Sequence, residues 1–224
     1  IYALKDGKLS LLTDGKSRNS INAWSDDGEL VAYTSTRRNG TDNDIYVMNP
    51  RDPSTSRMVA EVKGGGWNVG AFSPDKKSAV VGQYLSVSNV DMSLLDLATG
   101  KMTPIGDHTK DIAIGGASFA PDGSLWITSD EGSDFQRLGT IDIATGKFTP
   151  RGPAEKWDVD SFDISPDGSF IVYETNEAGI SKLKLLDLKT NNVRVVDGLP
   201  AGIIGGFEVS EWGEIGVTFT SARS

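Results

Sequence analysis

The sequence predicts an all-β fold built from repeated four-stranded antiparallel sheets, and two observations support this prediction. A turn of the form Ser-Pro-Asp-Gly recurs along the chain, and apolar runs of strand length flank every copy. The copies are spaced by 48, 47, 45 and 45 residues and begin at Ser25, Ser73, Ala120, Ser165 and, in degenerate form, Ser210. A nearly fixed period of this size is typical of repeat architectures, and four strands per period correspond to one blade of a β-propeller.

The chemistry of the repeated turn explains why it should close a hairpin. Proline presets φ to about −65° at the second position, Asp bonds back to its own backbone, and Gly accepts a positive φ. The first copy separates the apolar run Ile21–Trp24 from the run Leu30–Tyr33. A second landmark, Asp followed three residues later by Thr and then by Gly or Asn, should close the other hairpin of a blade. It occurs at Asp96–Gly100, Asp142–Gly146 and Asp187–Asn191.

These landmarks predict four complete blades, over residues 20–62, 67–105, 114–151 and 159–196. In the first blade we expect strands over Ser20–Trp24, Leu30–Thr36, Asp44–Met48 and Arg57–Val62, with a turn over Asn49–Ser56. No window of the chain carries a helical period. The residue before each repeated turn should belong to the packing layer between neighbouring blades, which gives Trp24, Phe72, Phe119, Ile164 and Val209.

The two ends of the chain predict complementary halves of a further blade. Residues 1–13 match the second hairpin of a blade, with strands over Ile1–Leu4 and Leu9–Thr13, and residues 203–220 match a first hairpin. Together they would complete a fifth blade and close residues 1–224 into a single domain, which hides sheet edges that otherwise invite aggregation. The alternative is a window from a ring of six to eight blades. The chain starts at Ile1 rather than Met, so we expect a processed product or a piece of a longer protein.

Composition excludes several classes of partner and chemistry. The 22 basic and 31 acidic residues give a net charge of −9, which argues against a nucleic-acid partner. The absence of cysteine removes disulfides and thiol chemistry, and no apolar run is long enough to span a membrane. We therefore expect a soluble protein, for which the bacterial cytoplasm and periplasm both remain open. No cofactor or metal motif is present, because Asn39–Asp44 lacks the residue order of a calcium loop.

One segment gives the repeat a more specific resemblance. The run Val31–Gly40, with its Arg-Arg-Asn-Gly loop, is followed by Asp44–Asn49, which reads D-I-Y-V-M-N. This combination resembles the TolB-type propeller repeat, which also builds the N-terminal propeller of prolyl oligopeptidase family serine peptidases. The turns extend the resemblance over the whole chain, but the full signature appears once.

The resemblance implies a non-catalytic propeller domain that gates the access of peptides to a hydrolase domain absent from this chain. The alternative is a TolB-like protein-interaction scaffold. The partner would be that hydrolase domain in the first case and a protein or peptide ligand in the second. A stand-alone five-bladed enzyme or lectin would need carboxylates or aromatic residues repeated on the innermost strands, and this sequence does not show them.

The sequence offers no catalytic residues of its own. A peptidase of that family carries its serine in a G-x-S-x-G elbow, and this motif is absent. The single histidine, His108, lies in a polar segment where we expect a surface loop, and no serine can be assigned to it as a nucleophile. Whether the parent protein is an enzyme therefore stays open.

Contact residues should lie in the loops between the second and third strands of each blade and between consecutive blades. These loops vary in length and composition, and variable loops on a rigid scaffold commonly carry binding. They include Tyr84–Val90 in the second blade. In dipeptidyl peptidases a glutamate pair on the propeller receives the peptide amine, which the resemblance suggests for Asp130 and Glu131. The candidate contact residues are Arg37, Arg38, Asp42, Asp130, Glu131 and Glu177.

Overall fold

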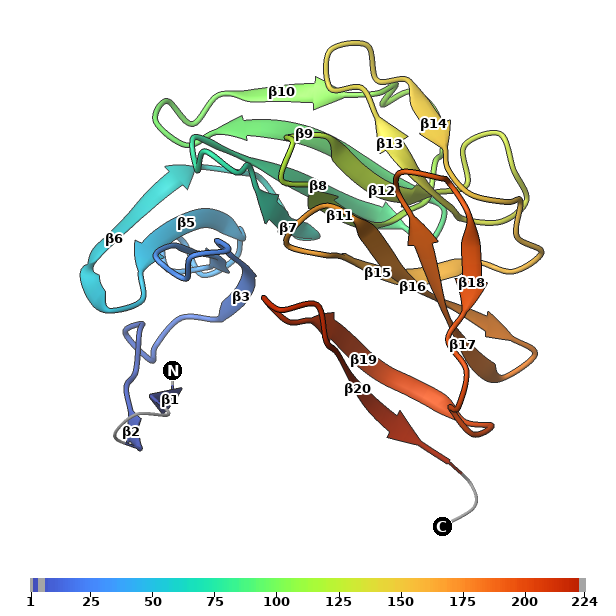
Figure 1. Ribbon diagram of the computed structural model, residues 1–224. Coiled ribbons are helices and arrows are strands. Elements are labelled where there is room, and N and C mark those ends of the chain that lie inside the picture. Colours follow the sequence, from blue (N-terminus) through green and yellow to red (C-terminus); the bar gives the residue numbers. More distant parts are fainter. Residues whose placement is uncertain (1, 4–6, 222–224) are drawn as a thin grey trace. The chain divides into compact units, whose positions relative to one another are not determined.

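The computed structural model describes residues 2, 3 and 7–221, which form strands and turns without a helix (Figure 1). None of these residues therefore belongs to a helix long and apolar enough to cross a membrane. The chain divides into two compact units, residues 1–108 and residues 109–224.

The first unit contains two four-stranded antiparallel sheets and one short hairpin. The hairpin consists of β1 (Tyr2–Ala3) and β2 (Lys8–Leu9). The first blade has the order β3 (Asn19–Trp24), β4 (Val31–Ser35), β5 (Asp44–Asn49) and β6 (Asp52–Ala60). The second blade consists of β7 (Trp67–Phe72), β8 (Ser78–Ser86), β9 (Asn89–Asp96) and β10 (Met102–Ile105).

The second unit repeats this architecture with two further four-stranded sheets and a final hairpin. The third blade consists of β11 (Ile114–Phe119), β12 (Leu125–Ser129), β13 (Arg137–Ile141) and β14 (Phe148–Pro150). The fourth consists of β15 (Val159–Ile164), β16 (Phe170–Glu177), β17 (Ile180–Asp187) and β18 (Val193–Val195). The hairpin pairs β19 (Ile203–Val209) with β20 (Ile215–Thr220). The prediction of an all-β fold with four complete propeller blades is confirmed.

The repeated turn folds as its chemistry predicts. In the first copy the Gly28 amide donates to the Ser25 carbonyl at 2.8 Å, and Gly28 has a φ of +64°. The Asp27 carboxylate accepts from the Ser25 hydroxyl at 2.7 Å and from the Glu29 amide at 3.0 Å. These bonds satisfy the turn locally, so the hairpin forms from residues that are close in sequence.

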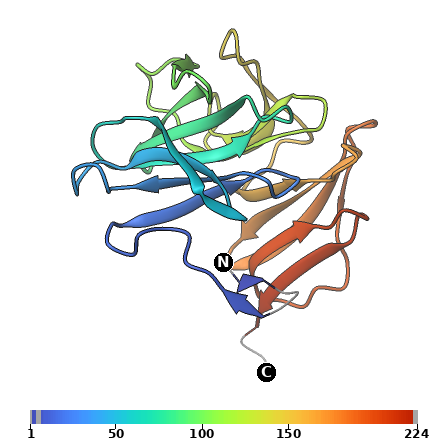
Figure 2. The ribbon, with the colours of Figure 1, turned by 90° about the vertical axis from the view of Figure 1, so that its left-hand side faces the viewer.

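Apolar side chains fill the space between neighbouring sheets within each unit. In the first unit Ile45 and Val47 of the first blade share a cluster with Val81 and Leu95 of the second, and Figure 2 shows these sheets as successive layers. In the second unit the third and fourth blades bury Trp126, Leu138, Ile171 and Tyr173 between them. The other side of the fourth blade packs through Val172 and Leu183 against the β19–β20 hairpin.

The predicted packing layer is correct in part. Phe72 is buried, and Ile164 and Val209 pack against the clusters of the second unit. Trp24 is 44% exposed and pairs with Val31, which belongs to a cluster distinct from the one that packs against the second blade. The predicted fifth blade would cover that face, so the assignment of Trp24 to the layer stays a prediction.

Three predicted boundaries were wrong. The turn expected over Asn49–Ser56 is shorter, because β6 begins at Asp52. The loop expected over Tyr84–Val90 is mostly paired, since β8 continues to Ser86 and Tyr84 pairs with Val90. The strand expected over Leu9–Thr13 ends at Leu9, which is 82% exposed.

The predicted fifth blade stays a prediction. Ile1, Leu4, Lys5 and Asp6, which belong to its N-terminal half, lie outside the described residues. The β1–β2 and β19–β20 hairpins form separate two-stranded sheets in different units. The single closed domain over residues 1–224 therefore also stays a prediction.

Candidate functional site

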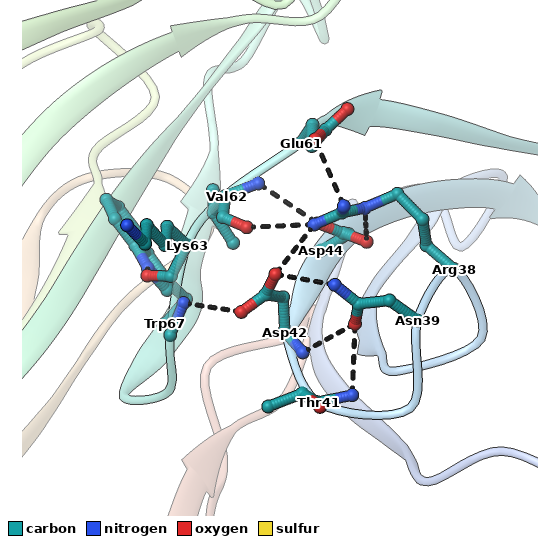
Figure 3. A network of polar contacts seen from close by, with 10 residues as sticks. Arg38, Asn39, Thr41, Asp42, Asp44, Glu61, Val62, Lys63 and Trp67 are labelled. Carbon is teal, nitrogen blue, oxygen red and sulfur yellow. Dashed lines mark hydrogen bonds and ion pairs between the residues drawn. The ribbon is translucent and has the colours of Figure 1, made fainter.

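Arg38 forms the centre of a polar network between β4 and β5 (Figure 3). Its Nε donates to Asp44 at 2.7 Å, and its two terminal nitrogens reach Asp42 at 3.0 Å and Glu61 at 3.1 Å. It also donates to the Val62 carbonyl at 3.2 Å. The hydrogen bond to Asp44 is the main cause of a raised pKa for Arg38. Three carboxylates thus neutralise this guanidinium.

The carboxylates that hold Arg38 also fix the loop to the segment after β6. Asp44 is fully buried and accepts from the Val62 amide at 3.0 Å. Asp42 accepts from the Gly64 amide at 2.8 Å, and this bond is the largest of the causes that lower the pKa of Asp42. Since backbone amides and Arg38 occupy these oxygens, Arg38 and Asp42 hold the loop in place.

Arg37 has a different environment from its neighbour. Its terminal nitrogen donates to the Tyr33 hydroxyl at 3.0 Å and to the Ser56 hydroxyl at 2.8 Å. The guanidinium carbon lies 3.8 Å from the centroid of the Tyr46 ring, a cation–π contact. Among the described residues, no carboxylate forms an ion pair with Arg37. Its positive charge therefore remains available to an external anion.

The acidic candidates of the second unit are distributed over two blades. Asp130 accepts from the Ala113 amide at 2.9 Å and so ties the loop after β12 to the segment before β11. The half-buried Glu131 follows it, and its amide donates to the Ser129 hydroxyl at 3.1 Å. Within the described part of the chain its carboxylate pairs with no cation. Asp130 likewise forms no ion pair among the described residues, and the role of both residues in receiving a ligand amine stays a prediction.

Glu177 belongs to a network centred on Lys184, which the sequence analysis missed. The Lys184 side chain is 9% exposed and lies 2.9 Å from Glu177 and 2.8 Å from Glu155. Burial opposes the charged form of Lys184, but the hydrogen bonds to both carboxylates outweigh it and raise its pKa. The bond from Lys184 is the main cause of the lowered pKa of Glu177.

Tyr173 completes this second network. Its hydroxyl donates to Glu155 at 2.8 Å, and burial, followed by this bond, raises its pKa. The one sequence signal was a lysine flanked by Leu183 and Leu185 in a strand, which does not identify its partners. Lys184 and the Thr175 hydroxyl both contact Oε1 of Glu177, which stabilises the fourth blade, and a role of Glu177 in binding stays a prediction.

His108 lies in a loop after β10, as expected, and its half-buried side chain contacts β9. Its Nε2 lies 2.7 Å from the Met92 carbonyl and its Nδ1 lies 3.8 Å from Asp91. In the part of the chain that the structure describes, no serine hydroxyl bonds to this ring. The described residues near His108 therefore supply no nucleophile. Of the six candidate contact residues, three lie in the first unit and three in the second, and their role in binding stays a prediction.

Comparison with known proteins supports the fold and gives it a context. No family model matches the chain. Dipeptidyl-peptidase 5 of Porphyromonas gingivalis is 26% identical over 183 residues, which are 78% of this chain and 20% of that protein. The chain thus spans about a fifth of the length of this curated relative.

Two solved structures show the same architecture. A prolyl endopeptidase matches with a TM-score of 0.72 and 18% identity, over 94% of this chain and 33% of its own. TolB from Acinetobacter baumannii matches with a TM-score of 0.64 and 19% identity, over 89% of this chain and 48% of its own. The chain has an all-β propeller fold. Its fold is that of the propellers in TolB and in prolyl endopeptidase.

Proposed function

We propose that this chain is the non-catalytic propeller domain of a prolyl-oligopeptidase-like serine peptidase, in which it limits the access of peptides to a hydrolase domain. The similarity to dipeptidyl-peptidase 5 over 183 residues carries the proposal, because it links the repeats to a peptidase by sequence. The likeness to prolyl endopeptidase over 94% of the chain supports it.

Gating of this kind needs loops that keep their shape, and both networks provide that. The Arg38 network fixes the loop between β4 and β5, and the Lys184 network fixes the start of the hairpin between β16 and β17. A rigid rim excludes a folded or long substrate by steric overlap and admits a short flexible peptide. The domain would thus set substrate size without any catalytic group.

The test uses the complete gene product that contains this chain. We expect that product to react with a fluorophosphonate probe and to cleave short peptide nitroanilides, with kcat/KM falling as the peptide is lengthened. Removal of the propeller should abolish this dependence on length. If the shortened enzyme does not fold, the peptide-length series on the intact enzyme still tests gating. Absence of probe labelling, or a kcat/KM independent of peptide length, would contradict the proposal.

A second candidate is a TolB-like protein-interaction scaffold, which the match to TolB over 89% of the chain favours. In that case the complete gene product carries no G-x-S-x-G domain and the fluorophosphonate probe labels no serine. The same labelling experiment therefore separates the two candidates.

A further inference from the structure

We propose that a pocket beside the first blade binds an oxyanion, a group with two or three negatively charged oxygens such as a carboxylate or a phosphate. The pocket lies between the segment before β3 and the loop after β4, and its volume is about 540 Å³. The residues that carry the argument are Lys16, Ser17, Arg18, Thr36, Arg37 and Thr41. All belong to the first unit, and anion binding by these residues requires no hydrolase domain.

The charge of this pocket is opposite to that of the protein. Three cationic side chains line it and no carboxylate does, although the chain carries a net charge of −9. Lys16 and Arg37 form no ion pair among the described residues, and the Arg18 guanidinium bonds only the neutral amide of Asn43, at 3.2 Å. Three cations without a carboxylate partner at one pocket leave a local positive potential that favours an anion.

Asp14 precedes these residues and forms no ion pair with Lys16, Arg18 or Arg37 among the described residues. Asp14 accepts from the Lys16 amide at 3.1 Å and from the Ser17 amide at 3.3 Å. It also accepts from the Ser17 hydroxyl at 3.2 Å. The hydrogen bonds from the two backbone amides are the main causes that lower the pKa of Asp14. The charge of Arg37 is the last of the causes that lower it. Asp14 shapes the turn that presents Lys16 and Arg18.

The cationic groups are attached to an ordered frame. Arg37 makes a cation–π contact with Tyr46 and a hydrogen bond to Ser56. Arg18 and Thr36 are joined by two hydrogen bonds. The Thr36 amide donates to the Arg18 carbonyl at 3.1 Å, and the Arg18 amide donates to the Thr36 hydroxyl at 3.2 Å. A frame that is already ordered lowers the entropic cost of binding.

The groups in the pocket match an oxyanion better than other ligands. A guanidinium presents parallel N–H donors whose spacing fits two oxygens of a carboxylate or phosphate. The hydroxyl of Thr36 accepts from Arg18 and keeps its own proton to donate, and Thr41 adds a second hydroxyl at the pocket. The adjacent Arg38 offers no such site, because Asp42, Asp44 and Glu61 already surround it.

The test titrates the ¹⁵N-labelled 224-residue chain with three probes and follows the amides of Ser17, Arg18, Gly40 and Thr41. The probes are N-acetyl-triglycine with a free carboxylate, the same peptide as its C-terminal amide, and inorganic phosphate. We expect saturable shifts with the free carboxylate, with phosphate or with both, and none with the peptide amide. The probe that binds identifies the source of the oxyanion. Shifts no larger than those from sodium chloride at equal ionic strength, for both anions, would overturn the proposal.

Charge-removing variants locate the site. Lys16→Gln, Arg18→Gln and Arg37→Gln should each weaken binding about 3- to 10-fold, since each removes one charge-assisted contact. Arg57→Gln is the matched control, because Arg57 is exposed on β6 of the same blade. The dissociation constant of Arg57→Gln for the anion should equal that of the unsubstituted 224-residue chain. Arg37→Gln also removes the contact with Tyr46. If that variant does not fold, the loss of anion affinity in Lys16→Gln, which breaks no side-chain bond, tests the site instead. Equal effects of Lys16→Gln and Arg57→Gln would refute the site.

Discussion

Two turn glycines allow the packing of the first two blades to be tested separately from turn geometry. Gly100, between β9 and β10, has a φ of +74°, and Gly123, between β11 and β12, has a φ of +85°. An added Cβ at Gly123 would meet no atom within 4 Å. At Gly100 the same atom would overlap the Val59 carbonyl oxygen of β6 in the neighbouring blade. The two positions share the strain of a positive φ and differ in the space around them.

The magnitudes follow from this difference. Alanine at a positive φ costs about 1–2 kcal/mol, so Gly123→Ala should lower the free energy of unfolding by that amount. Overlap in a packed region costs about a further 1–3 kcal/mol, so Gly100→Ala should lose about 2–5 kcal/mol in total. Because β6 lies in the first blade and Gly100 in the second, the additional loss measures how closely these blades approach.

Urea unfolding followed by far-ultraviolet circular dichroism measures both losses, with Gly123→Ala as the control for turn strain. We expect the Gly100→Ala midpoint to fall further than the Gly123→Ala midpoint, with similar slopes. Equal losses would refute the close approach of Gly100 to Val59. No loss at Gly123 would refute the positive φ of the repeated turn.

The remaining predictions concern charges, activity and the chain ends. Lys184→Met should cost about 3 kcal/mol of unfolding free energy, because it leaves the Glu155 and Glu177 carboxylates without their cation, and unchanged urea curves would contradict this. The Thr99 amide lowers the pKa of Asp96, so its contribution to stability is present above about pH 4 and is lost as the pH falls through the lowered value. Asp96→Asn should therefore reduce the fall of the urea midpoint at acid pH. An equal fall in the variant and in the unchanged chain would refute the hydrogen bond from Thr99 to Asp96. The purified chain should hydrolyse neither peptides nor esters, and activity that follows the folded chain through repurification would disprove that. If the chain ends share a fifth blade, removal of residues 1–13 should lower the melting temperature or cause aggregation, and an unchanged monomer would favour an open ring.

The sequence by itself determined the repeat, its turns and the number of complete blades. These features depend on local chemistry, because a Ser-Pro-Asp-Gly turn and the alternation of apolar residues act within a few positions of the chain. The predicted starts of the second, third and fourth blades and of the last hairpin, at residues 67, 114, 159 and 203, accordingly agree with the starts of β7, β11, β15 and β19. The Asp44–Asn49 strand also carried enough of the repeat signature to indicate the TolB-type architecture.

Only the tertiary structure decided the roles of individual charges. Arg37 and Arg38 are adjacent in an Arg-rich loop, yet one stacks on Tyr46 and the other is surrounded by carboxylates. Lys184 forms an ion pair with Glu155 in the segment after β14, and no spacing in the sequence indicates this pair. The physical reason is that strand register and the packing of successive sheets set the distances between such groups. Since those distances do not follow from separation along the chain, the oxyanion pocket became visible only in three dimensions.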